Sequence, residues 1–226
     1  QGAVPTLQDF HAELLRQPEP EARDVALAIE LFTEGSLNTF AKPTNVDTNS
    51  RILCYDIRDL GRQLLPVGML VVLDSIFNRI IRNRRQGRNT WIYIDEIYLL
   101  FQHEYSANFL FTLWKRVRKY RACCTGITQN VDDLLQSHTA RTMLANSEFL
   151  VMLNQAATDR TELARLLNIS DNQLSYITNV ESGCGLIKCG SAIVPFLDNF
   201  PKNRLYQLMT TKPSDSDSTG EMGRAA

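Results

Sequence analysis

The residues with the clearest chemical potential are two adjacent carboxylates that follow a short apolar run. Residues 91–94 read Trp-Ile-Tyr-Ile, and Asp95 and Glu96 come directly after them. Such a run is typical of a buried strand, and α/β sheets bind ligands at the carboxyl ends of their strands. Two carboxylates beside a sheet core are costly unless a cation accompanies them, so the pattern favours a metal at Asp95.

This order of residues is the Walker B arrangement of P-loop ATPases. In those enzymes the first acid holds Mg²⁺, usually through water, and the next glutamate can take a proton from the attacking water. The alternative is that Asp95 and Glu96 only mark a helix N-terminus, where acids complement the helix dipole. For an isolated Asp-Glu pair this structural interpretation is the commoner one.

A second polar residue at the end of a strand-like run favours the catalytic interpretation. Residues 122–129 read ACCTGITQ and end in Gln129. If both runs are strands of one parallel sheet, their equal direction places Gln129 beside Asp95 and Glu96. A glutamine there can sense a γ-phosphate or orient water, although a glutamine at a strand end is by itself usually a turn residue.

The pattern after Gly87 alternates between strands and helices. Strand-like runs cover residues 90–95, 122–129 and 148–154, and helical patterns lie around 108–120, 139–147 and 159–168. This alternation predicts βαβ units around a buried parallel sheet. Segments 183–190 and 191–200 meet at Gly190 and Ser191 and predict a hairpin at one edge of the sheet.

The region before Gly87 is predicted to be mostly helical. Two helical patterns in the first 34 residues are separated by Pro18 and Pro20, and a polar loop follows over residues 36–49. Residues 51–57 alternate and predict a strand. A long helix is predicted over about residues 64–84, with basic residues in its last turn and Gly87 at its cap.

Composition excludes a disordered or fibrous chain. The 226 residues are 44% hydrophobic, and 24 Lys and Arg against 25 Asp and Glu leave a net charge of −1. Any nucleic-acid partner would therefore need a local basic patch. Five cysteines within a mostly apolar context favour a reducing compartment, and we predict a cytoplasmic protein with free thiols, although Cys184 and Cys189 could approach each other.

No targeting or membrane-spanning segment is predicted. Residues 64–81 contain Asp74, Asn78 and Arg79 and repeat with a helical period, so we do not expect them to span a membrane. The first residues lack the basic and apolar regions of a signal peptide. The chain has no initiator Met and ends in a polar run, so we expect it to be part of a longer protein.

Several ordered motifs carry a resemblance to a known family. They are WIYIDEIYLLF, WKRVRKYRACCTGITQNVDDLL and MLANSEFLVMLNQAATDR, followed by VPF, FPK and LYQLMTTKP. In this order they closely resemble the VirB-four class of conjugation and type IV secretion ATPases. The resemblance covers nearly the whole chain and is most specific over residues 91–160.

The resemblance implies an α/β fold with a RecA-like P-loop NTPase core, related to the FtsK and HerA group. It implies a mostly parallel sheet flanked by helices, an N-terminal helical portion and a C-terminal β-hairpin. We expect a helical region and loop over residues 1–50, the core over residues 51–211 and a polar tail over residues 212–226. The implied cofactors are ATP and Mg²⁺. The implied partners are five further copies in a hexamer and other secretion-channel components, at the cytoplasmic face of a bacterial membrane complex.

The same resemblance assigns roles to seven residues of this chain. Asp95 would hold the metal, Glu96 and Gln129 would act in catalysis, and Arg118 falls where related coupling ATPases place an arginine finger. Weaker candidates for binding the nucleotide, or the phosphate of a neighbouring subunit, are Lys115, Arg141 and Arg160.

One departure from the family pattern is large. The phosphate-binding motif G-x-x-x-x-G-K-[ST] is absent: Gly185 and Gly190 have its glycine spacing, but Ser191 stands where lysine is required. Backbone N–H groups and that lysine normally cradle the phosphates. We therefore expect the C-terminal part of a motor domain, inactive on its own. Two other hypotheses stay open: a DNA-translocating motor of the FtsK or HerA type, and a structural interaction domain whose nucleotide site no longer functions.

Overall fold

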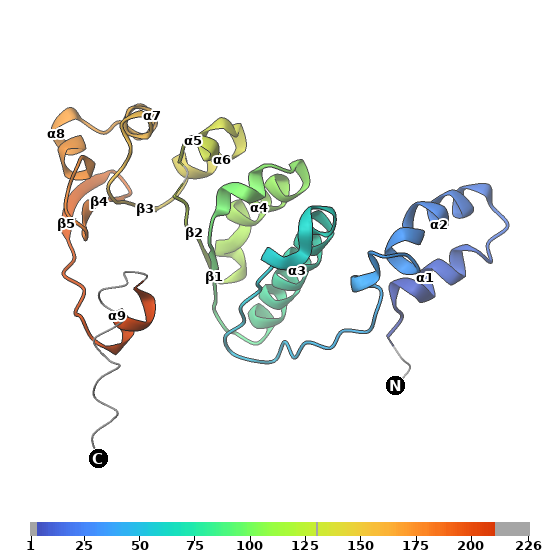
Figure 1. Ribbon diagram of the computed structural model, residues 1–226. Helices are drawn as coiled ribbons and strands as arrows, with labels where there is room; N and C mark the ends of the chain where they lie inside the picture. The colour runs from blue at the N-terminus through green and yellow to red at the C-terminus, as the bar shows by residue number, and fades with distance from the viewer. Residues whose placement is uncertain (1–3, 130, 211–226) are drawn as a thin grey trace, which may run out of the picture. The chain divides into compact units, whose positions relative to one another are not determined.

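The computed structural model describes residues 4–129 and 131–210 (Figure 1), apart from the side chains of Arg58, Arg62 and residues 157–159. The predicted polar tail over residues 212–226 lies outside this range. The chain divides into two units. The first contains residues 1–92 and 116–123, and the second contains residues 93–115 and 124–226.

The first unit begins with the two predicted helices, α1 (Leu7–Leu14) and α2 (Pro20–Thr33). A capping box starts α1: the Thr6 hydroxyl accepts the Asp9 N–H, and the Asp9 carboxylate accepts the Thr6 N–H. The two helices pack as a hairpin, in which the Gln8 amide donates to the Thr33 carbonyl oxygen at 3.2 Å. Thr33 and Ala26 are fully buried.

The long predicted helix is confirmed as α3 (Gly61–Arg85). Gly87 follows its end with φ 71°, the left-handed geometry expected of a glycine that closes a helix. By length and composition residues Gln63–Arg85 could cross a membrane: their most apolar 18 residues have a mean hydropathy of 1.8, and 28% of those residues are buried. Core helices pass the same test, and Asp74 and Arg79 lie within this one.

The strand predicted over residues 51–57 is wrong. The segment has no regular secondary structure and belongs to neither of the sheets that the described residues form. Within it, the Tyr55 hydroxyl lies 2.9 Å from the Ser75 hydroxyl of α3. Just before it, the Arg79 guanidinium of α3 donates to the carbonyl oxygens of Thr48 and Ser50. Alternating residues look like a strand, but a strand also needs a backbone neighbour, which a helix cannot supply.

A pair of parallel strands carries the predicted Walker B residues. β1 (Thr90–Ile94) pairs with β2 (Ala122–Gly126). The Thr90 N–H donates to the Arg121 carbonyl oxygen at 3.1 Å, and the Ile127 N–H donates to the Ile94 carbonyl oxygen at 2.8 Å. Both strands therefore advance in the same direction, as the sequence predicted.

In the second unit, helices pack around the segment that follows β1. This segment is the short 3₁₀ helix η3 (Ile97–Phe101), and it precedes α4 (Glu104–Arg116), α5 (Val131–Gln136) and α6 (His138–Ala145). The buried members of this core cluster are Ile97, Leu110, Leu134, Ala140 and Met143. α5 was not predicted, because a six-residue helix shows too little periodicity to recognise.

The C-terminal strands form a separate antiparallel sheet in the order β3-β4-β5. β3 (Phe149–Met152) pairs with β4 (Cys184–Cys189), which pairs with β5 (Ala192–Leu197) through the predicted turn at Gly190 and Ser191. The hairpin is thus confirmed. The predicted parallel direction of β3 is wrong, since an apolar run shows that a segment is a strand but not which neighbour it joins.

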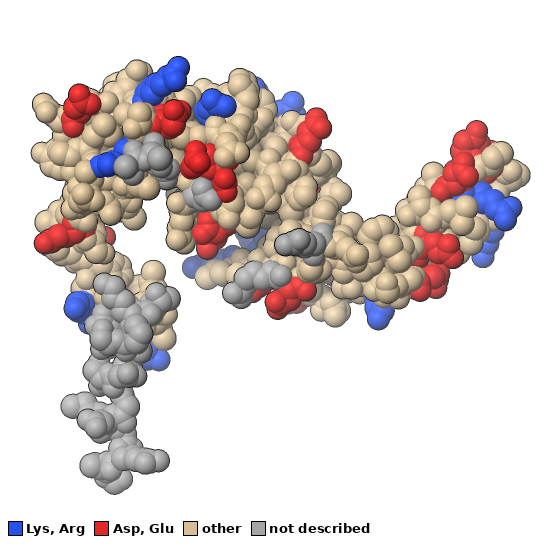
Figure 2. Space-filling view, turned by 45° about the horizontal axis from the view of Figure 1, so that its top comes forward, with Lys and Arg blue, Asp and Glu red and all other residues tan. Residues whose placement is uncertain are grey.

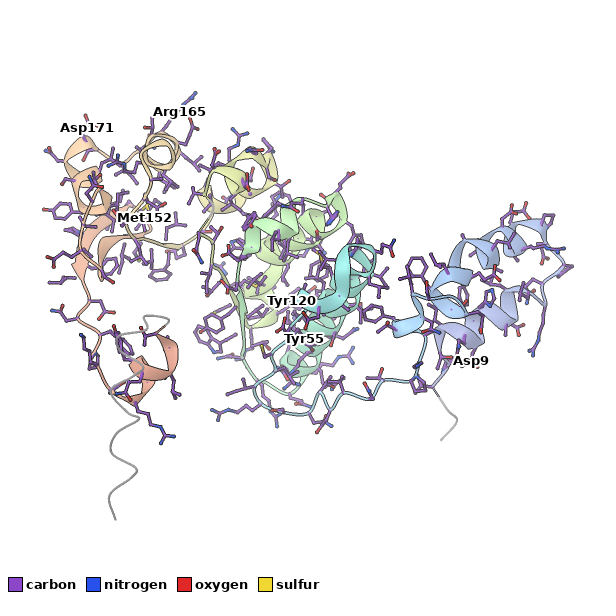
Figure 3. The ribbon with its side chains drawn as sticks, in the orientation of Figure 1. Asp9, Tyr55, Tyr120, Met152, Arg165 and Asp171 are labelled. Atoms are coloured by element: carbon purple, nitrogen blue, oxygen red, sulfur yellow. The ribbon has the colours of Figure 1, made fainter. Side chains whose placement is uncertain are left out.

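Among the described residues, one face of this sheet packs on a core cluster. Met152 and Leu186 face the cluster that includes Leu163 of α7 (Ala157–Leu167) and Ile177 of η5 (Ser175–Ile177), where Figure 3 labels Met152. The short helices α8 (Asp171–Leu174) and α9 (Arg204–Met209) complete the described chain. On the opposite face, Val151 pairs with Ile187 and Ile187 with Val194, and Val151 and Val194 are 62% and 56% exposed.

No disulfide joins the five cysteines, all of which lie within the described residues. Cys184 and Cys189 lie on the same strand, β4, separated by an odd number of positions, so their side chains point to opposite faces of the sheet. The approach between them that the hairpin had suggested is therefore excluded.

Candidate functional site

The two predicted Walker B acids lie directly after the last residue of β1. Ile92 and Ile94 alternate with the exposed Trp91 and Tyr93 along the strand, which ends at Ile94. Asp95 is exposed and Glu96 is half-buried. Asp95 Oδ1 accepts the Glu96 N–H at 3.1 Å.

The backbone of Glu96 is left-handed, with φ 46° and ψ 48°. This conformation brings Cβ close to the following carbonyl oxygen and costs about 1–2 kcal/mol for a residue other than glycine. It persists only where the surrounding structure holds it, and such strain clusters at functional sites. Glu96 precedes η3, but its side chain makes no capping hydrogen bond to that helix. The carboxylate is therefore not used as a helix cap.

Three main-chain N–H groups form hydrogen bonds between this turn and the residues that follow β2. The Ile127 N–H donates to Ile94 as described, and the Ile97 N–H donates to the Ile127 carbonyl oxygen at 2.9 Å. The Gln129 N–H then approaches Glu96 Oε2 at 3.5 Å. Gln129 is thus next to Glu96, as the parallel strands predicted, but it contacts the carboxylate through its main chain, and its side chain is exposed.

The three weaker basic candidates lie elsewhere in the second unit. Lys115 is exposed near the end of α4, where its ammonium lies 3.8 Å from the centroid of the Phe111 ring. Arg141 is exposed in α6, and Arg160 is half-buried in α7. Within the described part of the chain, none of these cations forms an ion pair with Asp95 or Glu96.

Arg118 belongs to the first unit and lies in η4 (Val117–Tyr120), with an exposed side chain. The segment is held on α3 through Tyr120, which Figure 3 labels. The Tyr120 ring meets the Phe77 ring edge-on at 5.7 Å between centroids, and the Arg84 guanidinium lies 5.3 Å from the Tyr120 centroid. Arg118 is thus an exposed cation on an anchored segment.

Two hollows of the second unit, of about 330 and 370 Å³, are lined by residues other than the predicted site residues. The larger one lies between η3 and α5, and the smaller one lies beside the start of β4. Neither of these two hollows includes Asp95, Glu96 or Gln129, and the side chains of Asp95 and Gln129 are exposed.

Sequence reasoning missed two residues next to the acids, Gly126 and Ile97. Gly126 ends β2, and the buried side chain of Ile97 occupies the space beside its Cα. A glycine inside a strand pattern was the available signal, because it often marks a close approach of another part of the chain.

Comparison with known proteins places this geometry in a family. A solved structure, that of VirB4 of Thermoanaerobacter pseudethanolicus, matches with a TM-score of 0.70 and 24% sequence identity. The match covers 86% of this chain and 54% of that one, so the chain spans about half of the VirB4 length. No curated protein matches.

The VirB4 likeness confirms the predicted α/β fold of the RecA-like P-loop class. The family model of the TraG P-loop domain matches residues 42–184, which include both strands of the parallel pair and all seven predicted site residues. This family-model match confirms the family predicted from the sequence motifs. Since the matched region is more than half of the chain, the protein belongs to the TraG P-loop domain family.

Proposed function

We propose that this chain carries the water-activating edge of a motor ATPase that serves conjugation or type IV secretion. The observation that supports this most directly is the strained Glu96 at the carboxyl end of the parallel strands. Its carboxylate lies beside the main-chain N–H of Gln129. A glutamate held in this way at a strand end is suited to accept a proton from an attacking water.

The residues at this edge fit a magnesium nucleotide. Asp95 and Glu96 offer the carboxylate oxygens that Mg²⁺ prefers, and the exposure of Asp95 leaves room for a hydrated ion. When bound, Mg²⁺ would neutralise charge on the phosphates of ATP. Asp95 would hold the hydrated ion, Glu96 would take the proton and Gln129 would sense the γ-phosphate.

The proposal requires a phosphate-binding loop, and the 226 residues contain no G-x-x-x-x-G-K-[ST] motif. We therefore expect the 226-residue chain, purified alone, to hydrolyse ATP at no more than the background rate. Phosphate release measured with and without the chain checks this. Turnover well above background that disappears in Glu96→Gln would contradict it.

The assignment of Glu96 is tested in the full-length protein with Glu96→Gln. The amide keeps the shape but cannot accept a proton, so turnover should fall by about 10²–10⁴-fold while ATP binding persists. Glu162→Gln, a change of an exposed glutamate in α7, is the matched control and should leave turnover unaltered. Unchanged turnover in Glu96→Gln removes the proposed function.

We assign Arg118 to the active site of a neighbouring copy, which its exposure in η4 allows. A guanidinium contributed in trans is worth about 10³–10⁵ in rate. Arg118→Ala should lower turnover far more than ATP affinity. Mixing Arg118→Ala chains with Glu96→Gln chains should restore part of the activity, since some interfaces then contain both intact groups. Co-assembly without recovery would favour Arg141 or Arg160.

The remaining parts of the proposal concern assembly. A finger that acts in trans requires a ring of copies, and we propose the hexamer, docked on other secretion-channel components at the cytoplasmic face of a bacterial membrane complex. Coupling of ATP hydrolysis to channel assembly or substrate transfer belongs to the same proposal. Mass measurement of the full-length protein with ATP analogues tests the hexamer directly.

A DNA-translocating motor is less well supported. On the face drawn in Figure 2, Lys and Arg are scattered among Asp and Glu, and the net charge is −1. Contact with DNA phosphates would require a local cluster of cations and would produce affinity that falls steeply with salt. Salt-dependent binding of duplex DNA to the full-length protein would reverse this preference.

A further inference from the structure

Gly126, the last residue of β2, lies where another side chain takes the space that its own would need. A Cβ built on Gly126 would lie 2.6 Å from Cδ1 of Ile97 and 3.2 Å from its Cγ2. Its distance from the Ile97 Cβ would be 3.5 Å. Ile97 therefore packs directly against the bare backbone of β2.

Ile97 has little freedom to move away. Its side chain is 5% exposed and belongs to the core cluster defined above with Leu110 and Met143. Rotation about the outer bond could shift Cδ1, but Cγ2 and Cβ are fixed by the stiff χ1 of a β-branched residue. A side chain at position 126 would thus push on the backbone at Ile97 as well as on its tip.

That backbone is the continuation of the strained turn. Ile97 follows Glu96 directly, and its N–H is bonded to Ile127, the residue after Gly126. The left-handed conformation of Glu96 is unfavourable by itself and must be maintained by its surroundings. The buried Ile97 on one side and the bonded end of β2 on the other supply that support.

We propose that Gly126 is a positioning residue: its lack of a side chain lets Ile97 pack against β2, and the packed Ile97 holds the Glu96 carboxylate beside the main-chain N–H of Gln129. This inference rests on the function proposed for Glu96. Gly126 does not touch the reacting atoms and acts through the direction of the glutamate. Small errors in that direction matter, since a displacement of about 1 Å at a reacting group can cost about 10²-fold in rate.

The test uses Gly126→Ala and Gly126→Val in the full-length protein. We expect kcat to fall about 10-fold for alanine and about 100-fold for valine, because the larger side chain displaces Ile97 further. The KM for ATP and the affinity for a non-hydrolysable ATP analogue should stay unaltered. A role only in folding would instead lower kcat and nucleotide affinity together.

A second substitution makes the test specific to the contact. Ile97→Val removes Cδ1, the atom nearest to the added methyl group. The double variant Gly126→Ala with Ile97→Val should therefore recover part of the kcat lost in Gly126→Ala, because the Cγ2 contact at 3.2 Å remains. Recovery of this kind is the coupling expected of two residues in direct contact.

Gly68→Ala is the matched control. Gly68 is a buried glycine of α3 in the first unit, and a Cβ there would overlap the tip of the Leu60 side chain. The same substitution with a comparable steric conflict should leave kcat within about twofold of the parent, as expected of residues that share no partners with Glu96.

The outcomes separate this inference from the function on which it rests. Unchanged kcat in both Gly126 variants, a parallel loss of kcat and affinity, or no recovery in the double variant overturns the role of Gly126. In each of these cases a large loss in Glu96→Gln leaves the proposed function standing. If Glu96→Gln itself keeps full turnover, the proposed function fails first.

Discussion

The turn after β1 and the two ends of β4 place different residues in a left-handed backbone conformation. Gly183, directly before β4, has φ 94°, and Gly190, in the turn between β4 and β5, has φ 57°. After β1 the left-handed residue is Glu96. At these two positions beside β4 the chain uses the residue that adopts a positive φ at least cost. Where a carboxylate is needed, it keeps a glutamate against the local preference, as functional sites often do.

The largest expected effect sharpens the β4 side of this comparison. In Gly183→Ala the new Cβ would overlap the backbone carbonyl of Asp198, which cannot rotate away. The same two residues are joined by the hydrogen bond from the Asp198 N–H to the Gly183 carbonyl oxygen at 2.8 Å. We expect a loss of about 3 kcal/mol in the free energy of unfolding, measured by urea denaturation. A loss below that of Gly190→Ala would contradict the steric argument.

Gly190→Ala isolates the conformational cost without a clash. The nearest atom to its added Cβ would be Glu148 Oε1 at 3.9 Å, which is ordinary contact. The expected loss is therefore only the left-handed penalty, about 1 kcal/mol, in the same denaturation experiment. A much larger value would mean that the turn carries further constraints.

Glu96→Gly is the converse change and tests whether strain is stored after β1. Relief of the left-handed penalty, less the extra chain entropy of glycine, should raise the free energy of unfolding by about 0.5–1 kcal/mol. Glu96→Ala keeps a Cβ and should show no such gain. Equal stabilities of the glycine and alanine variants would show that the left-handed backbone of residue 96 carries no strain, contrary to this prediction.

The smallest predicted effect concerns Asp9, a carboxylate whose pKa is set by a residue three positions before it. The Thr6 N–H first, and the Thr6 hydroxyl second, lower the pKa of Asp9 below its ordinary value of 3.8. Its stabilising contribution is present above the unfolded pKa and is lost as pH falls through the lower folded pKa. Thr6→Val should raise the pKa of Asp9 only in part, because the main-chain donor remains. NMR titration of the carboxyl carbon measures this shift.

Periodic and punctuated segments were predictable from the sequence. α3 was recognised by its helical repeat and Gly87, and the hairpin by Gly190. Asp95 and Glu96 were placed correctly after β1, because an apolar run that ends in acids identifies the end of a buried strand. These features depend on residues close together in sequence.

Features set by tertiary contacts were not predictable. Residues 51–57 contact a helix through the Tyr55 side chain, and β3 pairs with a strand that follows much later in the sequence. The left-handed Glu96 and the seat of Ile97 on Gly126 likewise depend on a strand that is distant in sequence. Pattern reasoning has no access to partners of this kind.

The uncovered face of the β3-β4-β5 sheet has a consequence for handling the purified chain. Phe149, Val151 and Val194 are all more than half exposed and share that face with Ile187. An exposed apolar surface of this kind promotes self-association of a protein in solution. Aggregation of the purified chain should therefore increase with protein concentration and with added sulfate, which strengthens apolar association. Replacing Val151 with threonine would keep the β-branched shape and reduce light scattering, which gives turnover assays of the isolated chain a well-dispersed sample.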